Sequence, residues 1–448
     1  MLVTAAIAAC LLVQSELPRK GVLGVPFTPL PPAQAKELNL PEGEGLIVVG
    51  SPVVNLTADK AGLKQGDIVL QINGQNAKAQ GLGEWVRTLT SGQPVTFKVN
   101  REGKEVTLSA PLVEKPRDPG GPNYTVEYSH ITSNGKRMRT IITKPKKPGK
   151  HPGWMFIQGL SPISYDFKLE GSTGDVTTMD GPMLFDMANS GFVTMRVEKP
   201  GVGDSEGGPY QDMDYTTELD IYRQAMKQLL ETSGVDTDNI FLFGHSMGGS
   251  FGPMIACEFP VKGIAVFGTS GRTWFEYLID VMRYQGIVAG GSYAASDDSV
   301  RYGAQMLALV MLEKKSLEEI KKSHPQLAQL VDGYFPGGYF NGKNLAFWRQ
   351  LNDTNFSKYW TDCNAPVLAV HGASDFVSYE ADHKLIANAV NKVRPGQGKF
   401  VSLPNSDHLF HNFATEPESQ RNFTKGKFNN DFTTLMKSWI SEILAKSN

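Results

Sequence analysis

Apolar and polar residues follow different patterns in the two parts of the chain. From residue 124 onward, apolar runs such as WMFIQGL, GFVTMRVEKPG, NIFLFGHS and PVLAVHGASD end in glycine-rich loops, and helix-compatible stretches separate several of them. Short apolar runs bounded by turn residues are typical of strands buried on both faces of a parallel sheet. The pattern predicts an α/β fold with a doubly wound, mostly parallel sheet, whose functional residues lie beyond the carboxyl ends of the strands.

Residues 16–114 carry shorter and more alternating runs. DIVLQING ends in an Asn-Gly turn and PVTFKVNREGKEVTLSAPL turns at Glu102-Gly103, so both are predicted to be β-hairpins. One helix is predicted around residues 83–89. KPRDPGGPN, residues 115–123, has no periodicity and predicts a linker. We therefore expect a small β domain over residues 16–114 and a larger α/β domain over residues 124–448.

The first fifteen residues, MLVTAAIAACLLVQS, form an uncharged apolar stretch about as long as a secretory h-region, ~7–15 residues. They predict a signal peptide over residues 1–15 and a periplasmic or secreted protein. No Lys or Arg precedes the apolar run, so a lipid anchor at Cys10 and a buried first strand or helix remain alternatives. A transmembrane helix needs ~20 apolar residues, and no stretch of the sequence is that long.

Net charge, cysteine positions and histidine spacing indicate which ligands, cofactors and disulfides to expect. The formal net charge is −2, which gives no reason to expect nucleic acid or an anionic membrane surface. Cys257 and Cys363 lie far apart; a disulfide between them is compatible with the sequence but not implied by it, and both are expected to be buried. No metal-ligand spacing such as H-E-x-x-H occurs, so neither a metal nor another cofactor is expected.

Ser246 is the candidate nucleophile. The stretch GHSMG fits G-x-S-x-G, with the apolar run NIFLF before it and the helix-compatible run SFGPMIACEF after it. A nucleophile elbow needs this strand–turn–helix setting, because the serine takes a strained turn and small neighbours avoid clashes with the strand and the helix. The alternative is an ordinary glycine-rich loop.

A serine hydroxyl needs a base, and the chain has eight histidines. His408 follows the run KFVSL on a polar loop near the C-terminus, after the serine in sequence, and is the predicted base. His411, three residues further on, is the rival. His245 lies inside the serine motif and should point away from the hydroxyl, while His371 precedes Gly372 and is expected to support a loop.

Asp375 is the predicted acid, because it follows an apolar run and a glycine-containing turn in VLAVHGASD. It would accept the Nδ1–H of His408 and stabilise the imidazolium. Asp382 is the alternative acid, although it falls within the following predicted helix. The alternative role for Asp375 is to cap that helix.

Nucleophile, acid and histidine in this order, each at a predicted strand end, resemble the α/β-hydrolase family, especially its esterase and serine-aminopeptidase-like branches, over about residues 124–448. The oxyanion hole would use the N–H of Met247 and that of Leu160. Here Gln158-Gly159 departs from the His-Gly pair of many relatives. EKPGVGDSEG resembles the family's Asp-x-Arg-Gly-x-Gly-x-Ser loop and is interpreted as structural, forming part of the wall of the site.

Residues 272–362 are rich in aromatic residues and methionine, as in TWFEYLIDVMRYQG and NLAFWRQLND. An insertion at the catalytic end of the sheet predicts a helical cap over the active site. Most of its apolar residues are expected to form the core of the cap itself. The remainder would face the substrate and favour an acyl or aromatic group over a highly charged one.

GVLGV, followed by AGLKQGDIVLQING, resembles a bacterial PDZ domain of the kind appended to periplasmic proteases, over roughly residues 20–113. The resemblance implies that Val22, Leu23, Gly24 and Val25 present N–H groups to the C-terminal carboxylate of a peptide, which adds a strand to the sheet edge. SPVVNLTADKAGL is longer than the corresponding run in the family. The alternative is a groove filled by the chain itself or by the hydrolase domain.

These residues predict a serine hydrolase that cleaves small carboxylic ester or acyl substrates through an acyl-enzyme intermediate. An aminopeptidase- or thioesterase-like hydrolase is the nearest alternative, since the same residues can cleave amides and thioesters. A peptide-binding adaptor, in which the PDZ-like domain binds and the hydrolase fold is only a scaffold, is the alternative from another class.

Overall fold

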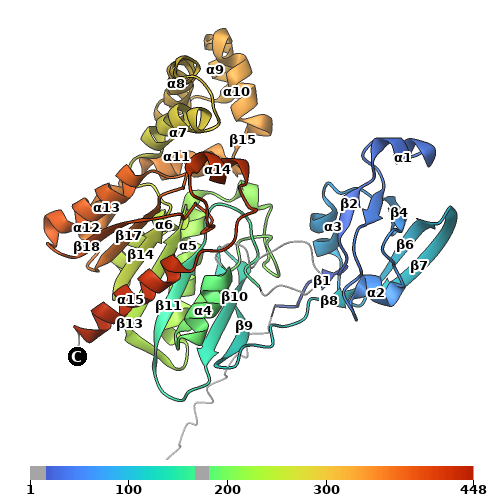
Figure 1. Cartoon of the computed structure of the whole chain (residues 1–448), viewed down its shortest axis with the longest axis horizontal. Coiled ribbons are helices and arrows are strands. Elements are labelled where there is room, and N and C mark those ends of the chain that lie inside the picture. Colours follow the sequence, from blue (N-terminus) through green and yellow to red (C-terminus); the bar gives the residue numbers. More distant parts are fainter. Residues whose placement is uncertain (1–16, 167–180, 447–448) are drawn as a thin grey trace, which may run out of the picture.

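The computed structural model describes residues 17–166 and 181–446. Two sheet-based parts lie side by side, the first in blue to teal and the second in green to red (Figure 1). The predicted signal peptide, residues 1–15, lies outside the described residues.

The N-terminal part is an antiparallel sheet with the strand order β2-β3-β4-β6-β7, and β5 pairs with β4. Its elements are β2 (Phe27–Pro29), β3 (Leu46–Val48), β4 (Ile68–Ile72), β5 (Gln75–Asn76), β6 (Pro94–Arg101), β7 (Lys104–Pro111), α1 (Pro32–Glu37), α2 (Thr57–Ala61) and α3 (Leu82–Thr88). The β4–β5 turn holds Asn73 and Gly74 at φ 50° and 76°, and the β6–β7 turn holds Glu102 and Gly103 at φ 52° and 81°. Both predicted hairpins are therefore present, each closed by two residues of positive φ.

Two short strands close the ends of this part. β1 (Gly21–Val22) pairs antiparallel with β8 (Val113–Glu114), so the segments that enter and leave the domain lie side by side. Just before β1, the buried Arg19 side chain binds Asp204 Oδ2 at 2.5 Å and Asp166 Oδ2 at 2.7 Å. Arg19 also donates to the carbonyls of Lys115 and Pro116. The start of the predicted linker is thus held against the C-terminal part.

The C-terminal part is built on an eight-stranded sheet, order β18-β17-β14-β13-β11-β12-β10-β9. Its strands are β9 (Tyr124–Ser133), β10 (Lys136–Pro145), β11 (His151–Ile157), β12 (Val193–Val197), β13 (Val235–His245), β14 (Gly263–Phe267), β17 (Val367–Gly372) and β18 (Gly398–Leu403). Neighbours from β12 to β18 are parallel, whereas β10 runs antiparallel to both β9 and β12, so the sheet is mixed.

Helices cover both faces of this sheet. One face packs against α5 (Tyr215–Glu231), α6 (Gly248–Glu258) and α13 (Glu380–Val393), the other against α4 (Gly181–Asn189) and α15 (Asp431–Ala445). Along β13, Ile240 and Leu242 face the first core while Phe241 and Phe243 face the second. Because alternate side chains of a strand point to opposite faces and both faces of this sheet are buried, a wholly apolar run forms a strand here. The architecture is the predicted α/β-hydrolase fold.

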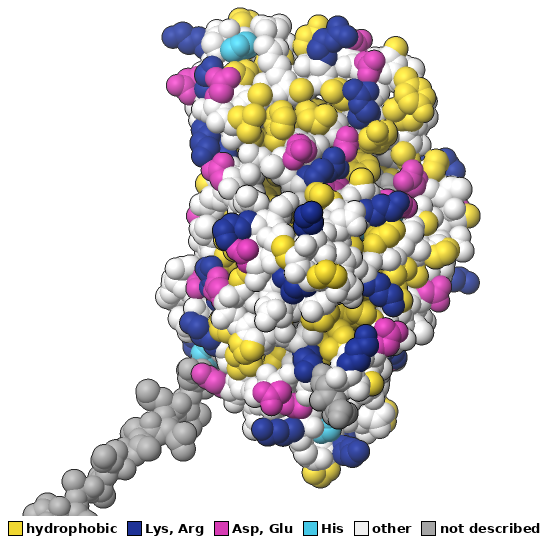
Figure 2. Space-filling view, turned by 90° about the vertical axis from the view of Figure 1, so that its left-hand side faces the viewer, with side chains coloured by type: hydrophobic (Ala, Val, Ile, Leu, Met, Phe, Trp, Pro, Cys, Tyr) yellow, Lys and Arg dark blue, Asp and Glu magenta, His cyan; other side chains and the backbone are white. Residues whose placement is uncertain are grey.

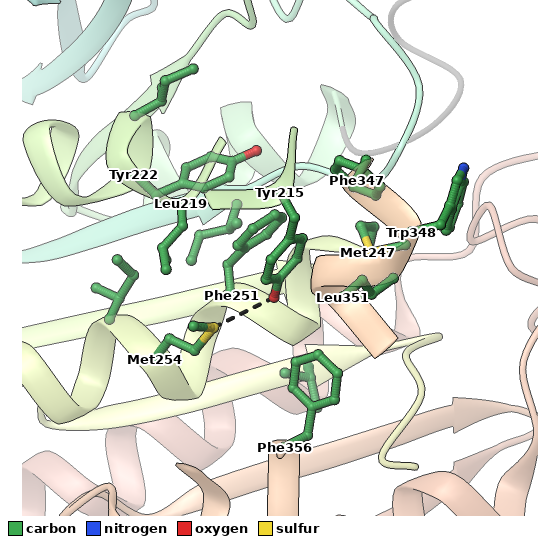
Figure 3. Close-up of a cluster of buried hydrophobic side chains, with 14 of the residues drawn as sticks. Tyr215, Leu219, Tyr222, Met247, Phe251, Met254, Phe347, Trp348, Leu351 and Phe356 are labelled. Atoms are coloured by element: carbon green, nitrogen blue, oxygen red, sulfur yellow. Dashed lines mark hydrogen bonds between the residues drawn. The ribbon is translucent and has the colours of Figure 1, made fainter. Parts of the chain in front are cut away.

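The segment predicted as a cap is largely helical. It contains α7 (Trp274–Val288), α8 (Tyr293–Leu307), α9 (Leu317–Ser323), α10 (Ala328–Tyr334), the hairpin β15 (Tyr339–Phe340) and β16 (Lys343–Asn344), α11 (Leu345–Asp353) and α12 (Phe356–Asp362). α7 to α10 stand out beyond the sheet at the top of Figure 1. Figure 3 shows that α11 packs on the core of the sheet domain, where Phe347 and Leu351 lie beside Tyr215, Phe251 and Met247.

The prediction that both cysteines are buried is wrong for Cys257. Cys363 is buried, whereas Cys257 is exposed, and both thiols are free. Cys257 lies in the last turn of α6, where the helix emerges from the core after nine successive buried residues. The apolar pattern of the helix extends to this position, but Cys257 lies beyond the buried stretch, and its thiol contacts α12 at the Tyr359 carbonyl.

The surface carries charges of both signs. Lys, Arg, Asp and Glu side chains are interspersed with apolar ones over the face shown in Figure 2. Within residues 17–166 and 181–446, no helix is both long enough and apolar enough to cross a membrane.

Glu198, at the start of the loop after β12, is a buried carboxyl close to other acids. It accepts hydrogen bonds from the Asp204 N–H at 3.0 Å and from the Ser164 hydroxyl. Burial, together with the nearby charges of Asp166 and Asp204, raises the pKa of Glu198 to about 7. The folded state therefore binds this proton more tightly than the unfolded chain does.

We expect Glu198→Gln to become stabilising as the pH rises. Wild-type stability from this group is fully present below the unfolded pKa of 4.5 and is lost as the pH passes through about 7. Glutamine resembles the protonated carboxyl, so the variant should gain on the order of 3 kcal/mol relative to wild type between pH 4.5 and 8. Urea unfolding of both proteins across this range measures the difference. A constant difference between them would contradict the raised pKa.

Candidate active site

Ser246 lies in a sharp turn between β13 and α6, with φ at +53°. Its N–H donates to the Phe267 carbonyl at 2.9 Å. A Cβ on Gly244 would lie 2.6 Å from the Gly248 carbonyl oxygen, and one on Gly248 would lie 1.9 Å from the Ile157 oxygen. Glycine is thus required on both sides of the serine, because strand, helix and the neighbouring β11 leave no room for a side chain.

The structure brings Ser246, His408 and Asp375 together. His408 Nε2 lies 3.0 Å from Ser246 Oγ, and His408 Nδ1 lies 2.9 Å from Asp375 Oδ2. His408 is on the loop between β18 and α14 (Glu416–Arg421), and Asp375 follows β17. All three side chains therefore come from the carboxyl end of the sheet, as the strand pattern predicted.

Asp375 is completely buried, and its carboxylate is held by several donors. The N–H groups of Val377 and Ser378 donate at 2.7 and 3.0 Å, and the Ser378 hydroxyl donates at 2.5 Å. Burial alone would raise the pKa of Asp375, but the His408 ring and these hydrogen bonds outweigh it and hold the pKa well below its ordinary value. The carboxylate is consequently ionised at neutral pH.

The alternative acid and the alternative role for Asp375 do not fit the geometry. Asp382 pairs with Arg272, whose Nη2 lies 2.9 Å from Asp382 Oδ2, and it accepts the Gly271 N–H at 3.0 Å. α13 begins after Tyr379 and has no side-chain cap. Asp375 therefore faces His408 rather than the N-terminus of that helix.

The other histidines of this region support loops. His245 Nε2 donates to the His408 carbonyl at 2.8 Å, and His371 Nε2 donates to the Ser378 carbonyl at 3.2 Å. His411 is fully buried beside Asp407, with its Nδ1 3.8 Å from the carboxylate. It is Nε2 of His408, not a nitrogen of His411, that lies against Ser246.

Asp407 supports the His408 loop, which sequence reasoning missed. Its Oδ1 accepts the N–H groups of Leu409 and His411 at 2.9 and 2.7 Å, and its Oδ2 accepts the Ser419 hydroxyl at 3.1 Å. These bonds fix the backbone on both sides of His408. An acidic residue directly before the predicted base was the available signal, since aspartate side chains commonly bind nearby backbone N–H groups.

A cavity of about 370 Å³ opens at Ser246 and His408, within the ~300–1,000 Å³ typical of small-molecule sites. Most of its lining is apolar or aromatic and comes from the cap, including Trp274, Tyr277, Leu278, Met282, Phe340, Leu351 and Phe356. Arg272, Gln285 and Asn341 add polar atoms. Leu160 and Met247, the predicted oxyanion residues, also line this cavity.

The loop predicted to supply the second oxyanion donor lies against the serine. A Cβ on Gly159 would lie 3.2 Å from Ser246 Cβ, so only a residue without a side chain fits here comfortably. Whether the N–H groups of Leu160 and Met247 bind an oxyanion stays a prediction.

The PDZ-like loop leaves donors available. The carbonyls of Val22, Leu23 and Gly24 accept bonds from the Thr57 hydroxyl, the Ala58 N–H and the Val53 N–H, respectively. Within the described residues, the N–H groups of Leu23, Gly24 and Val25 donate no hydrogen bond. β2 follows this loop and forms an edge of the sheet.

Comparison with known proteins agrees with this part of the fold. Residues 21–112 match the PDZ domain family. Residues 21–112 form a PDZ domain.

Curated relatives are similar over short stretches. The chain is 46% identical over 63 residues to a probable periplasmic serine endoprotease DegP-like of Marinomonas sp. (strain MWYL1), covering 14% of this chain and 13% of that protein. It is 26% identical over 132 residues to periplasmic serine endoprotease DegP of Escherichia coli (strain K12), covering 29% and 28%. The chain thus spans less than a third of the length of either relative.

Solved structures resemble the larger part of the chain. The α/β hydrolase GrgF from Penicillium sp. sh18 has a TM-score of 0.44 at 13% identity, covering 72% of this chain and 99% of that one. The Pyrococcus furiosus esterase PF2001 has a TM-score of 0.42 at 11% identity, covering 73% and 96%. Similarities of this size say nothing about the reaction.

The crowding at the serine turn makes Gly248→Ala a sharp test of the elbow. The added methyl would overlap the Ile157 carbonyl, so we expect a loss of about 1–3 kcal/mol in unfolding free energy and a large fall in activity. Gly252→Ala, in the same helix, is the matched control. Its new methyl would lie 3.4 Å from Ile264, and it should leave stability equal or slightly higher. Equal effects of the two substitutions on thermal unfolding would refute the steric account.

Proposed function

We propose that the protein is a serine hydrolase that cleaves carboxylic esters through an acyl-enzyme intermediate. The observation that carries this proposal is the continuous contact from Asp375 through His408 to Ser246 at the mouth of an apolar cavity. A glycine-rich loop alone would need neither a base in contact with the serine nor an ionised carboxylate behind that base.

In the proposed reaction, Ser246 Oγ attacks the ester carbonyl while His408 Nε2 accepts its proton. The negative charge that develops on the carbonyl oxygen would be stabilised by the N–H groups of Met247 and Leu160. His408 then returns the proton to the leaving alcohol. A water molecule, activated by the same nitrogen, releases the acyl group, and Asp375 holds the imidazolium in both steps.

The lining of the cavity favours an uncharged substrate. Aromatic and aliphatic side chains of the cap, such as Trp274, Met282 and Phe356, surround the space next to Ser246. Such a surface stabilises an acyl or aromatic group through the burial of apolar area. Aminopeptidase- and thioesterase-like reactions use the same residues, and a panel of esters, thioesters and aminoacyl amides separates them by kcat/KM.

Ser246→Ala should lower kcat for p-nitrophenyl butyrate by a factor of about 10⁴ to 10⁶. His408→Ala should cause a loss of similar order, since serine and base act as a unit. His411→Ala is the control, because this ring is buried but does not contact Ser246. Unchanged turnover in the serine variant would falsify the assignment of Ser246, whereas a wild-type protein that turns over none of the substrates would favour the adaptor alternative.

We also propose that the PDZ domain binds a peptide C-terminus, with the N–H groups of Leu23, Gly24 and Val25 as donors to the carboxylate. Together with the leader-like residues 1–15 and the periplasmic relatives, this supports a periplasmic or secreted protein. Cell fractionation distinguishes this location from the cytoplasm.

A fluorescent peptide with an apolar C-terminal residue should bind the full chain at least about tenfold more tightly than its amidated form, since amidation removes the charge that the loop would hold. Gly24→Ala should weaken binding, because its methyl would overlap Leu56. Gly43→Ala, also at positive φ but with open space around it, is the control. Equal binding of the free and amidated peptides would contradict the site, and ester turnover should be the same in all variants.

A further inference from the structure

A cluster of buried charges lies next to the Gly159-Leu160 loop, which packs against Ser246. Lys199 Nζ lies 2.7 Å from Glu218 Oε1, and Lys343 Nζ lies 3.5 Å from Glu218 Oε2. The three side chains are at most 1% exposed. Lys199 comes from the loop after β12 (EKPGVGDSEG), Glu218 from α5 and Lys343 from β16 in the cap. None of them lines the cavity at Ser246 or contacts His408 or Asp375 in the structure.

Lys199 binds the loop directly. Its Nζ donates to the Gly159 carbonyl at 2.5 Å and to the Leu160 carbonyl at 3.2 Å. The Tyr210 hydroxyl donates to the same Leu160 carbonyl. Two successive carbonyl oxygens of the loop therefore point at one ammonium group.

This arrangement fixes the direction of an N–H group. In a trans peptide, the carbonyl of one residue and the N–H of the next point in opposite directions, and within the described residues the only cis bond precedes Pro209. Because Lys199 draws the Gly159 oxygen to its side, the Leu160 N–H must point the opposite way. The face of Gly159 that is free of a side chain lies against Ser246, and Leu160 lines the cavity.

We propose that Lys199 is a positioning residue, which orients the Leu160 N–H as an oxyanion donor by holding the Gly159 and Leu160 carbonyls. The inference rests on the proposed serine hydrolase function and assigns a role within it. Lys199 does not touch the substrate; it acts on the reaction through the peptide group that does.

The energetics favour such a role over a contribution to stability. Removing an ammonium group from water costs several kcal/mol, and a buried ion pair regains this only in part. Burial lowers the pKa of Lys199, and it lowers that of Lys343 to about 7 even though Glu218 opposes the shift. Two cations on one carboxylate stabilise the fold poorly, but a charged donor holds a carbonyl more firmly than a neutral one does.

The cap reaches the same loop through Tyr210. Lys343 Nζ lies 3.4 Å from the centre of the Tyr210 ring and donates to the Tyr210 carbonyl at 3.1 Å. Within the described residues, Lys343 donates no hydrogen bond to residues 159 and 160, so it shares the carboxylate and the burial of Lys199 but does not hold the loop directly. The chain thus supplies its own control for the removal of a buried cation.

The test compares Lys199→Met with Lys343→Met in the full chain. Lys199→Met should lower kcat for p-nitrophenyl butyrate about 10- to 100-fold, approaching the loss of one oxyanion donor, with KM nearly unchanged. Lys343→Met should lower kcat by no more than several-fold, because Lys343 reaches the loop only through Tyr210. Thermal unfolding of both variants measures any general loss of stability.

An inhibitor provides the readout that a purely structural role would not change. Ser246 Oγ adds to the carbonyl carbon of a trifluoromethyl ketone while its proton passes to His408. The ketone oxygen becomes negatively charged and occupies the oxyanion hole. The affinity for the ketone should fall in Lys199→Met by the same factor as kcat, while the affinity for the non-reactive alcohol of the same carbon skeleton stays constant. Equal losses in the two lysine variants, or an unchanged ketone affinity in Lys199→Met, would overturn the proposal.

Should Lys199→Met fail to fold, Tyr210→Phe tests the same loop, since it removes one donor to the Leu160 carbonyl. Several-fold losses in both kcat and ketone affinity are expected, and wild-type values would count against the inference. Ser246→Ala separates a failure of the proposed function from a failure of the positioning role of Lys199. If that variant stays active, the proposed function fails; if it is inactive while Lys199→Met is fully active, only the positioning role fails.

Discussion

The tight approach of three backbone segments at Ser246 is the constraint on which the larger domain depends. β13 ends, α6 begins and the end of β11 passes within van der Waals distance, so the chain tolerates no side chain at Gly244 or Gly248. The serine between them is forced to a positive φ. Strain of this kind persists only where the surroundings hold it, and here the two apolar cores on either side of the sheet do so. The hydroxyl is consequently presented at a fixed point, toward which the loops carrying Asp375 and His408 converge.

The cap and the sheet domain share one hydrophobic core. Residues of α11 pack with α5 and with Met247 of the serine turn, so the side chain of Met247 belongs to this core, and Met247 also lines the cavity at Ser246. An opening of the cap at α11 would expose apolar area that now supports the turn itself. The base of the cap therefore supports the site, whereas α8 to α10 project beyond the sheet (Figure 1).

The sequence was most informative where a signal is local. The G-x-S-x-G turn, the hairpin turns at Asn73 and Glu102, and the apolar runs of the sheet each follow from a few neighbouring residues. The places of Asp375 and His408 followed from chain order within a resembled fold. Lys199, Asp407 and Arg19 could not be assigned in this way, because each owes its role to partners that folding brings near. The exposure of Cys257 was missed because an apolar helical pattern does not reveal where the helix leaves the core.

The attachment of the PDZ domain determines how a peptide bound to it could reach the larger domain. Its two ends pair as β1 and β8, and Arg19 fixes both to Asp166 and Asp204 of the larger domain. A double attachment of this kind removes the free rotation that a single flexible linker would allow. For a peptide held in the PDZ loop, the distance to Ser246 would be set by the length of the peptide rather than by linker motion. The effective concentration of a tethered ester at Ser246 would then depend on how many residues separate the ester from the peptide's C-terminus. It would be zero for a peptide too short to reach from the PDZ loop to Ser246, and it would decline again for a peptide much longer than that distance.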